Sequence, residues 1–163
     1  MGRKTFRKII TTPELISQIN LENVSLAESF LKEKATRSSS TTINSYRCDL
    51  NLFFVWNILN NNNKFFINIK KLEFANFFSF ATDELQWGSA RCNRLRSTLS
   101  SLSQFVERFM DDLYPDFKNI VLKTIQSVPK NERREKTILS NEQVESLLTH
   151  FKKTDSQVAC WLA

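Results

Sequence analysis

Glycine and proline are scarce in this sequence, with two Gly and three Pro among 163 residues. A sheet protein of this length needs many tight turns, and most such turns use Gly, Pro or Asn-Gly pairs. The composition therefore argues against an all-β fold and predicts an all-α chain. Gly2 and Gly88 lie too far apart to form a P-loop or a GxGxxG loop, which excludes a glycine-rich phosphate site.

Cysteine and long apolar runs are also rare. Cys48, Cys92 and Cys160 are odd in number, widely spaced and without a CxxC pair, so we expect buried thiols in a reducing, cytoplasmic setting. The basic N-terminus lacks the apolar run of a signal peptide. No window approaches the roughly 18 consecutive apolar residues of a membrane span, so no membrane partner is expected. No residue pattern indicates a cofactor or a metal site.

Acidic residues are missing from particular stretches. The chain has 23 Lys and Arg against 17 Asp and Glu, a net charge of +6. Residues 1–13, 34–47 and 89–106 contain bases and no acid, whereas residues 140–163 contain two bases and three acids. The positive charge is thus concentrated before residue 140, a distribution that favours a nucleic-acid partner.

Apolar residues recur at steps of three and four, which predicts a series of helices. A short helix is expected after Thr12 and Pro13, and a second is expected to begin with a capping box formed by Ser25 and Glu28. The other predicted segments are a helix ending near Leu59, a short strand or extended connector over Phe65–Ile69, helices over 72–85 and 89–110, a short helical stretch after Pro115, and a helix with a capping box of Ser140 and Gln143.

Two of these helices begin in the same unusual way. The segments Ser38–Arg47 and Ser89–Ser97 combine hydroxyl and amide side chains with Arg and contain no acid, although a helix N-terminus normally attracts Asp and Glu. Free N–H groups, hydroxyls and Arg at a helix start can bind phosphate. For either helix alone, ordinary capping and a solvated Arg explain the pattern better than a phosphate site does. We expect the two starts to lie side by side and to grip a duplex backbone, and together with the basic residues Lys130, Arg133, Arg134 and Lys136 they favour DNA.

The segment PKNERREK at 129–136 has no apolar period, which is typical of a linker. We predict a basic arm and short helix over 1–19, a helical domain over 20–128, a linker over 129–139 and the start of a second domain over 140–163. The last apolar run, Val158–Ala163, has no C-cap, so we expect the chain to be the N-terminal piece of a longer protein.

The order of several motifs resembles the N-terminal part of the tyrosine recombinases, the phage-integrase family, over residues 20–163. The motifs are Ser25–Leu31, Thr41–Leu50, Phe53–Trp56, Ser89–Phe105, Asn119 and Lys136–Val144. The resemblance implies a four-helix, SAM-like core-binding domain over about residues 20–112. From about residue 137 it implies the first helices of a catalytic domain on the opposite face of the duplex.

The same resemblance implies sequence-specific binding of double-stranded DNA in integration and recombination, with self-association on DNA in the full-length protein. Arg91 and Arg94 would reach guanine edges, and Asn93 an adenine. The family's catalytic Arg, Lys, His and Tyr residues would all follow Ala163, so we expect this chain to bind DNA without cutting it. The implied DNA-binding residues, together with those of the linker, are Thr41, Thr42, Asn44, Ser45, Arg47, Ser89, Arg91, Asn93, Arg94, Ser97, Arg133, Arg134 and Lys136.

Two other functions fit parts of the pattern. One is a helix-turn-helix DNA binder outside the recombinases, and the other is a helical protein-interaction module whose basic surface meets an acidic partner. The segment Arg3–Lys8 is either an arm that reaches DNA or a disordered basic tail. Several residues have side chains that could act in catalysis, metal binding or base stacking, but they lack partners at a definable spacing. We expect them to pack in the core or to face solvent. These are Tyr46, Tyr114, His150 and the phenylalanines Phe74, Phe77, Phe78 and Phe80.

Overall fold

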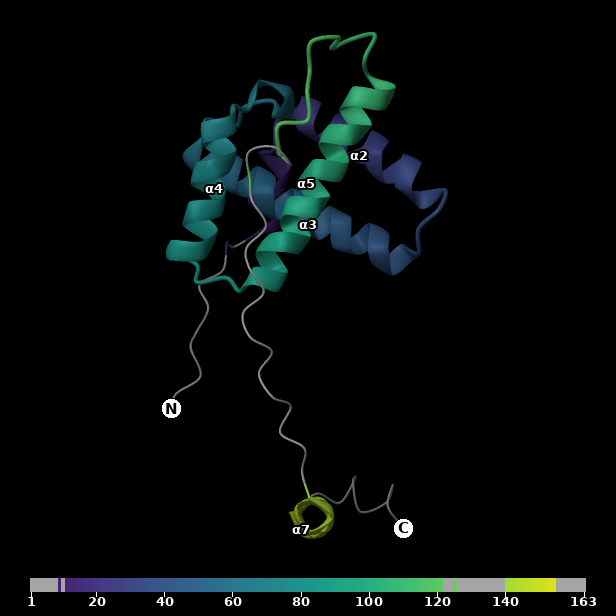
Figure 1. Ribbon diagram of the computed structural model, residues 1–163, viewed down its shortest axis with the longest axis vertical. Helices are drawn as coiled ribbons and strands as arrows, with labels where there is room; N and C mark the ends of the chain where they lie inside the picture. Colours follow the sequence, from purple (N-terminus) through teal and green to yellow (C-terminus); the bar gives the residue numbers. More distant parts are fainter. Residues whose placement is uncertain (1–8, 10, 122–124, 126–139, 155–163) are drawn as a thin grey trace. The chain divides into compact units, whose positions relative to one another are not determined.

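The computed structural model describes residues 9, 11–121, 125 and 140–154, and side chains up to residue 150. The chain forms two compact units, residues 1–131 and 132–163. No described residue belongs to a β-strand, so the predicted all-α class is confirmed for this part of the chain. The elements are α1 (Pro13–Ser17), α2 (Leu21–Ala35), α3 (Ser40–Asn60), the 3-10 turn η1 (Phe66–Asn68), α4 (Lys71–Asp83), α5 (Ser89–Phe109) and α7 (Asn141–Thr154) (Figure 1).

Helices α3 and α5 cross near the centre of the first unit, with α4 on the left and α2 at the upper right (Figure 1). Helix α3 packs against α1, α2 and α5, and α4 packs against α5. The shared core is rich in aromatic rings. Phe53 of α3 is fully buried, and its ring stacks on Phe74 and meets the edge of Phe77. Phe74, Phe77 and Phe78 are buried and Phe80 is half-buried, which confirms core packing for this group.

Helix α2 begins earlier than predicted. Its N-cap is Asn20, whose Oδ1 accepts the N–H of Glu22 at 2.8 Å, and the expected capping box of Ser25 and Glu28 is wrong because both residues lie inside the helix. Asn20 is itself held by Asn63, whose Oδ1 accepts the Asn20 N–H at 3.1 Å. This tertiary contact moves the helix start by five residues, from Ser25 to Asn20 as the N-cap, and the local sequence does not reveal it.

The asparagine run after α3 ends the helix, as its turn-forming character suggests. Asn62 and Asn63 both adopt the left-handed region, with φ of 54° and 52°. Two buried asparagines then anchor the connector, since Asn23 and Asn57 donate to the carbonyl of Lys64 at 2.9 and 2.7 Å. The chain enters the 3-10 turn η1 there, so neither the strand nor the fully extended connector predicted for 65–69 forms.

The segment after α5 follows an irregular path, and the short helical stretch predicted after Pro115 is wrong for residues 116–120. Asn119 accounts for this path. Its N–H donates to Glu107 Oε1 at 2.8 Å, and its side-chain amide donates to the carbonyl of Ser100 at 3.2 Å. These bonds hold the backbone against α5 in place of helical hydrogen bonds.

The second unit contains α7, whose predicted capping box is confirmed. The Ser140 N–H donates to Gln143 Oε1 at 3.0 Å, and the Gln143 N–H donates to Ser140 Oγ at 3.3 Å. Val144, Leu147 and Leu148 of this helix are exposed. Among the described helices of both units, none is long and apolar enough to cross a lipid bilayer.

Glu73 joins the connector before α4 to the first turn of that helix. Its Oε2 accepts the Lys70 N–H at 2.8 Å, and its Oε1 pairs with the Lys64 ammonium group. Burial raises the pKa of Glu73, but hydrogen bonds from Lys64 and from the Lys70 backbone outweigh burial, so the pKa lies below its ordinary value of 4.5. The carboxylate therefore stabilises the folded state in its ionised form.

Because the folded-state pKa is the lower one, this stabilisation is present above about pH 4.5 and is lost as the pH falls through the folded-state pKa. We expect Glu73→Gln to lower the free energy of unfolding by about 0.5–1 kcal/mol at neutral pH, because the amide oxygen can still accept the Lys70 N–H whereas the ion pair with Lys64 is lost. In acid the variant and the wild type should converge. Urea titrations at both pH values measure this, with Glu22→Gln in the first turn of α2 as a control. A difference that persists in acid would contradict the assignment.

Candidate nucleic-acid interface

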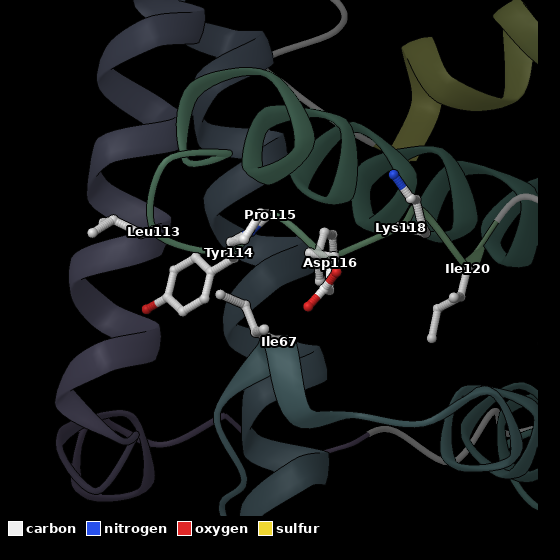
Figure 2. Close-up of a pocket in the computed structure, with 8 residues that line it drawn as sticks. Ile67, Leu113, Tyr114, Pro115, Asp116, Lys118 and Ile120 are labelled. Atoms are coloured by element: carbon white, nitrogen blue, oxygen red, sulfur yellow. The ribbon is translucent and has the colours of Figure 1, made fainter.

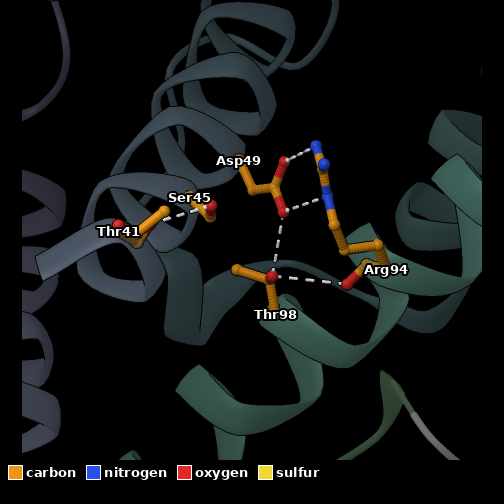
Figure 3. Close-up of polar contacts among 5 residues, drawn as sticks. All are labelled: Thr41, Ser45, Asp49, Arg94 and Thr98. Carbon is orange, nitrogen blue, oxygen red and sulfur yellow. Dashed lines mark hydrogen bonds and ion pairs between the residues drawn. The ribbon is translucent and has the colours of Figure 1, made fainter. Parts of the chain in front are cut away.

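A polar hollow of about 430 Å³ lies where the N-terminal half of α3 meets the second turn of α5. It is lined by Ser40, Thr41, Asn44, Ser45 and Cys48 of α3 and by Arg94 of α5, with no carboxylate among these residues. Four of the six are predicted DNA-binding residues. Figure 3 shows three of the four, Thr41, Ser45 and Arg94, close to the junction of the two helices.

Helical spacing explains why α3 presents these side chains together. Residues three and four positions apart share a face, so Thr41, Asn44, Ser45 and Cys48 line one side of the helix, while Leu50 lies in the core. The first turn of α3 carries no acid. Its start is capped by Ser39, whose Oγ accepts the Thr42 N–H at 3.3 Å. The hydroxyls therefore meet solvent at the electropositive end of the helix dipole.

An ion pair between a buried Asp and a partly exposed Arg ties the two helices together at the hollow. Both carboxylate oxygens of Asp49 in α3 accept hydrogen bonds from one edge of the Arg94 guanidinium. Nη2 donates to Oδ1 at 2.8 Å, and Nε donates to Oδ2 at 3.2 Å (Figure 3). The Thr98 hydroxyl also donates to Oδ2 at 3.1 Å. The Asp49 side chain is 5% exposed, whereas that of Arg94 is 56% exposed. A buried carboxylate thus holds an arginine whose far end reaches solvent.

The prediction did not include Asp49 or Thr98. A signal for Asp49 was present, because this acid falls among the apolar positions Tyr46, Leu50 and Phe53 of a helix that otherwise keeps its polar groups on another face. An acid at such a position needs a buried partner. The sequence alone does not identify that partner, which lies 45 residues further along the chain.

The two helix starts do not meet end to end. Asp49, at the crossing with α5, lies nine residues after Ser40, which corresponds to about 14 Å along the axis of α3. The candidate interface therefore combines the side of α3 with the second turn of α5, and the expectation that the two helix starts lie side by side is wrong. The N-cap of α5 is Gly88, which offers no capping side chain.

The remaining predicted residues of α5 are not among those that line the hollow. The Arg91 guanidinium lies 4.2 Å from the ring centroid of Trp87, a cation–π contact that keeps the arginine at the helix start. Ser89 and Asn93 are half-buried, and Ser97 is exposed.

Arg47, a predicted DNA-binding residue of α3, has its positive charge balanced by an acid of a neighbouring helix. Its guanidinium forms a two-pronged pair with Glu28 of α2, and this hydrogen bonding raises the pKa of Arg47 above its ordinary value. Thr42 is exposed and contacts Ser39 at the cap. The linker residues Arg133, Arg134 and Lys136 lie outside the described residues.

The thiols divide between the core and the surface. Cys92 is buried as predicted, and burial raises the pKa of its thiol. The prediction of a buried Cys48 is wrong, because Cys48 shares the solvent-facing side of α3 with Asn44 and Ser45. Cys160 lies outside the described residues.

A second hollow, of about 480 Å³, lies between η1 and the segment 113–120 (Figure 2). Its lining is mostly apolar, with Asp116 and Lys118 as its charged residues, which provides no pair of nucleophile and base. Tyr114, also in this lining, packs against Phe65, as Tyr46 packs against Phe30. Within the described part of the chain, no three His, Cys, Asp or Glu side chains are grouped to hold a metal ion.

Comparisons of the chain with protein-family models, with curated proteins and with solved structures find no match.

Proposed function

We propose that this protein binds double-stranded DNA through the polar hollow, as the core-binding part of a site-specific tyrosine recombinase. The observation that carries the proposal is the lining of the hollow. Hydroxyl and amide groups of Thr41, Asn44 and Ser45 lie beside the exposed end of Arg94, and no carboxylate lines the same surface. Phosphate and base edges are recognised by this combination of donors.

Charge supports the same partner. The net charge of +6 draws the chain toward a polyanion, and the acid-free first turns of α3 and α5 leave two helix dipoles uncompensated. The side of a long helix is also a shape that fits the major groove. The recombinase assignment rests on the resemblance of the motifs, and it carries the expectation of a cytoplasmic protein that self-associates on DNA in its full-length form.

The test is a fluorescence-anisotropy titration of a random-sequence duplex at about 50 mM and about 200 mM salt. DNA binding through several phosphates requires affinity to fall steeply, with a slope of log affinity against log salt of about −3 or steeper. Polyglutamate serves as a competitor of the same charge without duplex geometry. No binding at the lower salt, or a salt-independent affinity, would overturn the proposal. Displacement by polyglutamate as effective as by duplex would instead favour an acidic protein partner.

A further inference from the structure

The ion pair at the hollow leaves one end of Arg94 available. A guanidinium has five N–H donors arranged in a rigid plane, and Asp49 uses the edge formed by Nε and one hydrogen of Nη2. Nη1 and the second hydrogen of Nη2 form another fork at the end of the side chain. Because the Arg94 side chain is 56% exposed and lines the hollow, this end fork is accessible from solvent.

The same pair cancels most of the charge of Arg94 while fixing its orientation. Asp49 is held in turn by Thr98, so the carboxylate has little freedom to rotate (Figure 3). A phosphate also accepts two donors from a planar guanidinium, but most of the affinity gained there comes from the net charge of the cation. The Hoogsteen edge of guanine, with N7 and O6, requires two parallel donors in one plane. A neutralised but oriented guanidinium is therefore better suited to a base than to the backbone.

We infer that Arg94 reads a guanine in the major groove with its end fork, and that Asp49 is the positioning residue that aims it. This inference rests on the proposed function. Of the two arginines that the resemblance directs to guanine it selects Arg94, and it adds Asp49 as the residue that orients Arg94. The competing explanation is that Asp49 and Arg94 only hold α3 against α5. The two explanations differ in what removal of the Asp49 charge does to affinity and to base preference.

The experiment selects binding sites from a random duplex pool and then measures affinity for a selected site, for its guanine-substituted versions and for random duplex. Asp49→Asn removes the carboxylate charge and frees the orientation of Arg94. Arg94→Lys keeps a cation beside Asp49 and removes the planar fork. Arg108→Lys, an exposed arginine in the last turn of α5, is the matched control.

For the wild type we expect one position at which guanine is preferred roughly tenfold to a hundredfold, the range of a bidentate contact. Asp49→Asn should abolish this preference, yet bind random duplex as tightly as the wild type or a few-fold more tightly, because one negative charge has gone. Arg94→Lys should abolish the preference and weaken binding to random duplex by no more than a few-fold, because a cation is kept at the hollow, and Arg108→Lys should change neither. If Asp49→Asn does not fold, the Arg94→Lys variant tests the inference by itself.

Several outcomes would overturn the inference. One is a wild type that binds duplex with steep salt dependence but selects no guanine. Another is an unchanged guanine preference in a folded Asp49→Asn or Arg94→Lys variant. A third is a uniform loss of affinity for all sequences, which is the result expected of a purely structural pair. Failure of the wild type to bind any duplex would instead overturn the proposed function itself.

Discussion

Replacing Phe53 with alanine is expected to lower the free energy of unfolding by about 3–5 kcal/mol, the range measured for truncating a buried aromatic side chain. Phe53 has no exposed surface, and its ring contacts rings from α3, η1 and α4. The space left cannot be refilled easily, because the neighbouring Phe74 and Phe77 are themselves held in the core. Chemical denaturation followed by circular dichroism gives the value.

Phe109, at the end of α5, is the matched control because its side chain is 60% exposed. Phe109→Ala removes the same atoms from a site that mostly faces water, so we expect a loss below about 1 kcal/mol. Equal losses at the two positions would show that Phe53 is not the centre of the core. A Phe53→Ala loss below about 1 kcal/mol would lead to the same conclusion.

Introducing two carboxylates into the polar hollow is expected to weaken duplex DNA binding by about a hundredfold, since juxtaposed like charges cost several kcal/mol. The double variant Thr41→Glu with Asn44→Glu places these charges on the solvent face of α3. Acids near a helix start are favoured by the dipole, so the variant should melt at or slightly above the temperature of the wild type. Loss of binding without loss of stability is the diagnostic combination.

The control variant changes the net charge equally at exposed positions outside the hollow, with Leu72→Glu on α4 and Gln104→Glu on α5. General electrostatic attraction would make the two double variants bind alike, and that result would contradict the placement of the interface. Arg94 is left unchanged in this test. Its reversal to Glu would face the buried Asp49 with a second carboxylate and would confuse unfolding with loss of binding.

Most helices of the fold could be predicted from the sequence, because the spacing of apolar residues agrees with the positions of the residues that begin and end helices. Pro13 with Thr12 and the asparagine run after Leu59 marked boundaries that the structure retains. The boundaries that were missed depend on distant partners. The start of α2 depends on Asn63, and the irregular path after α5 depends on bonds from Asn119 to Glu107 and Ser100.

The candidate site could be predicted in part for the same reason. Local pattern was sufficient to select Thr41, Asn44 and Ser45, since one helix places them together. It was not sufficient to separate the arginines, because Arg47 and Arg94 look alike in the sequence. Their partners are Glu28 and Asp49, and only the packing of α3 against α2 and α5 reveals which guanidinium lines the hollow.

Helix α3 contains neither glycine nor proline between Ser40 and Asn60, and it carries the hollow in one half and the Phe53 ring cluster in the other. The proposed DNA-binding surface is therefore one end of a continuous helix whose other end is embedded in the core. Such a helix has no hinge at which the surface could be remodelled. A duplex that docks there must supply the bending and groove widening itself, so how easily a sequence deforms would contribute to its selection.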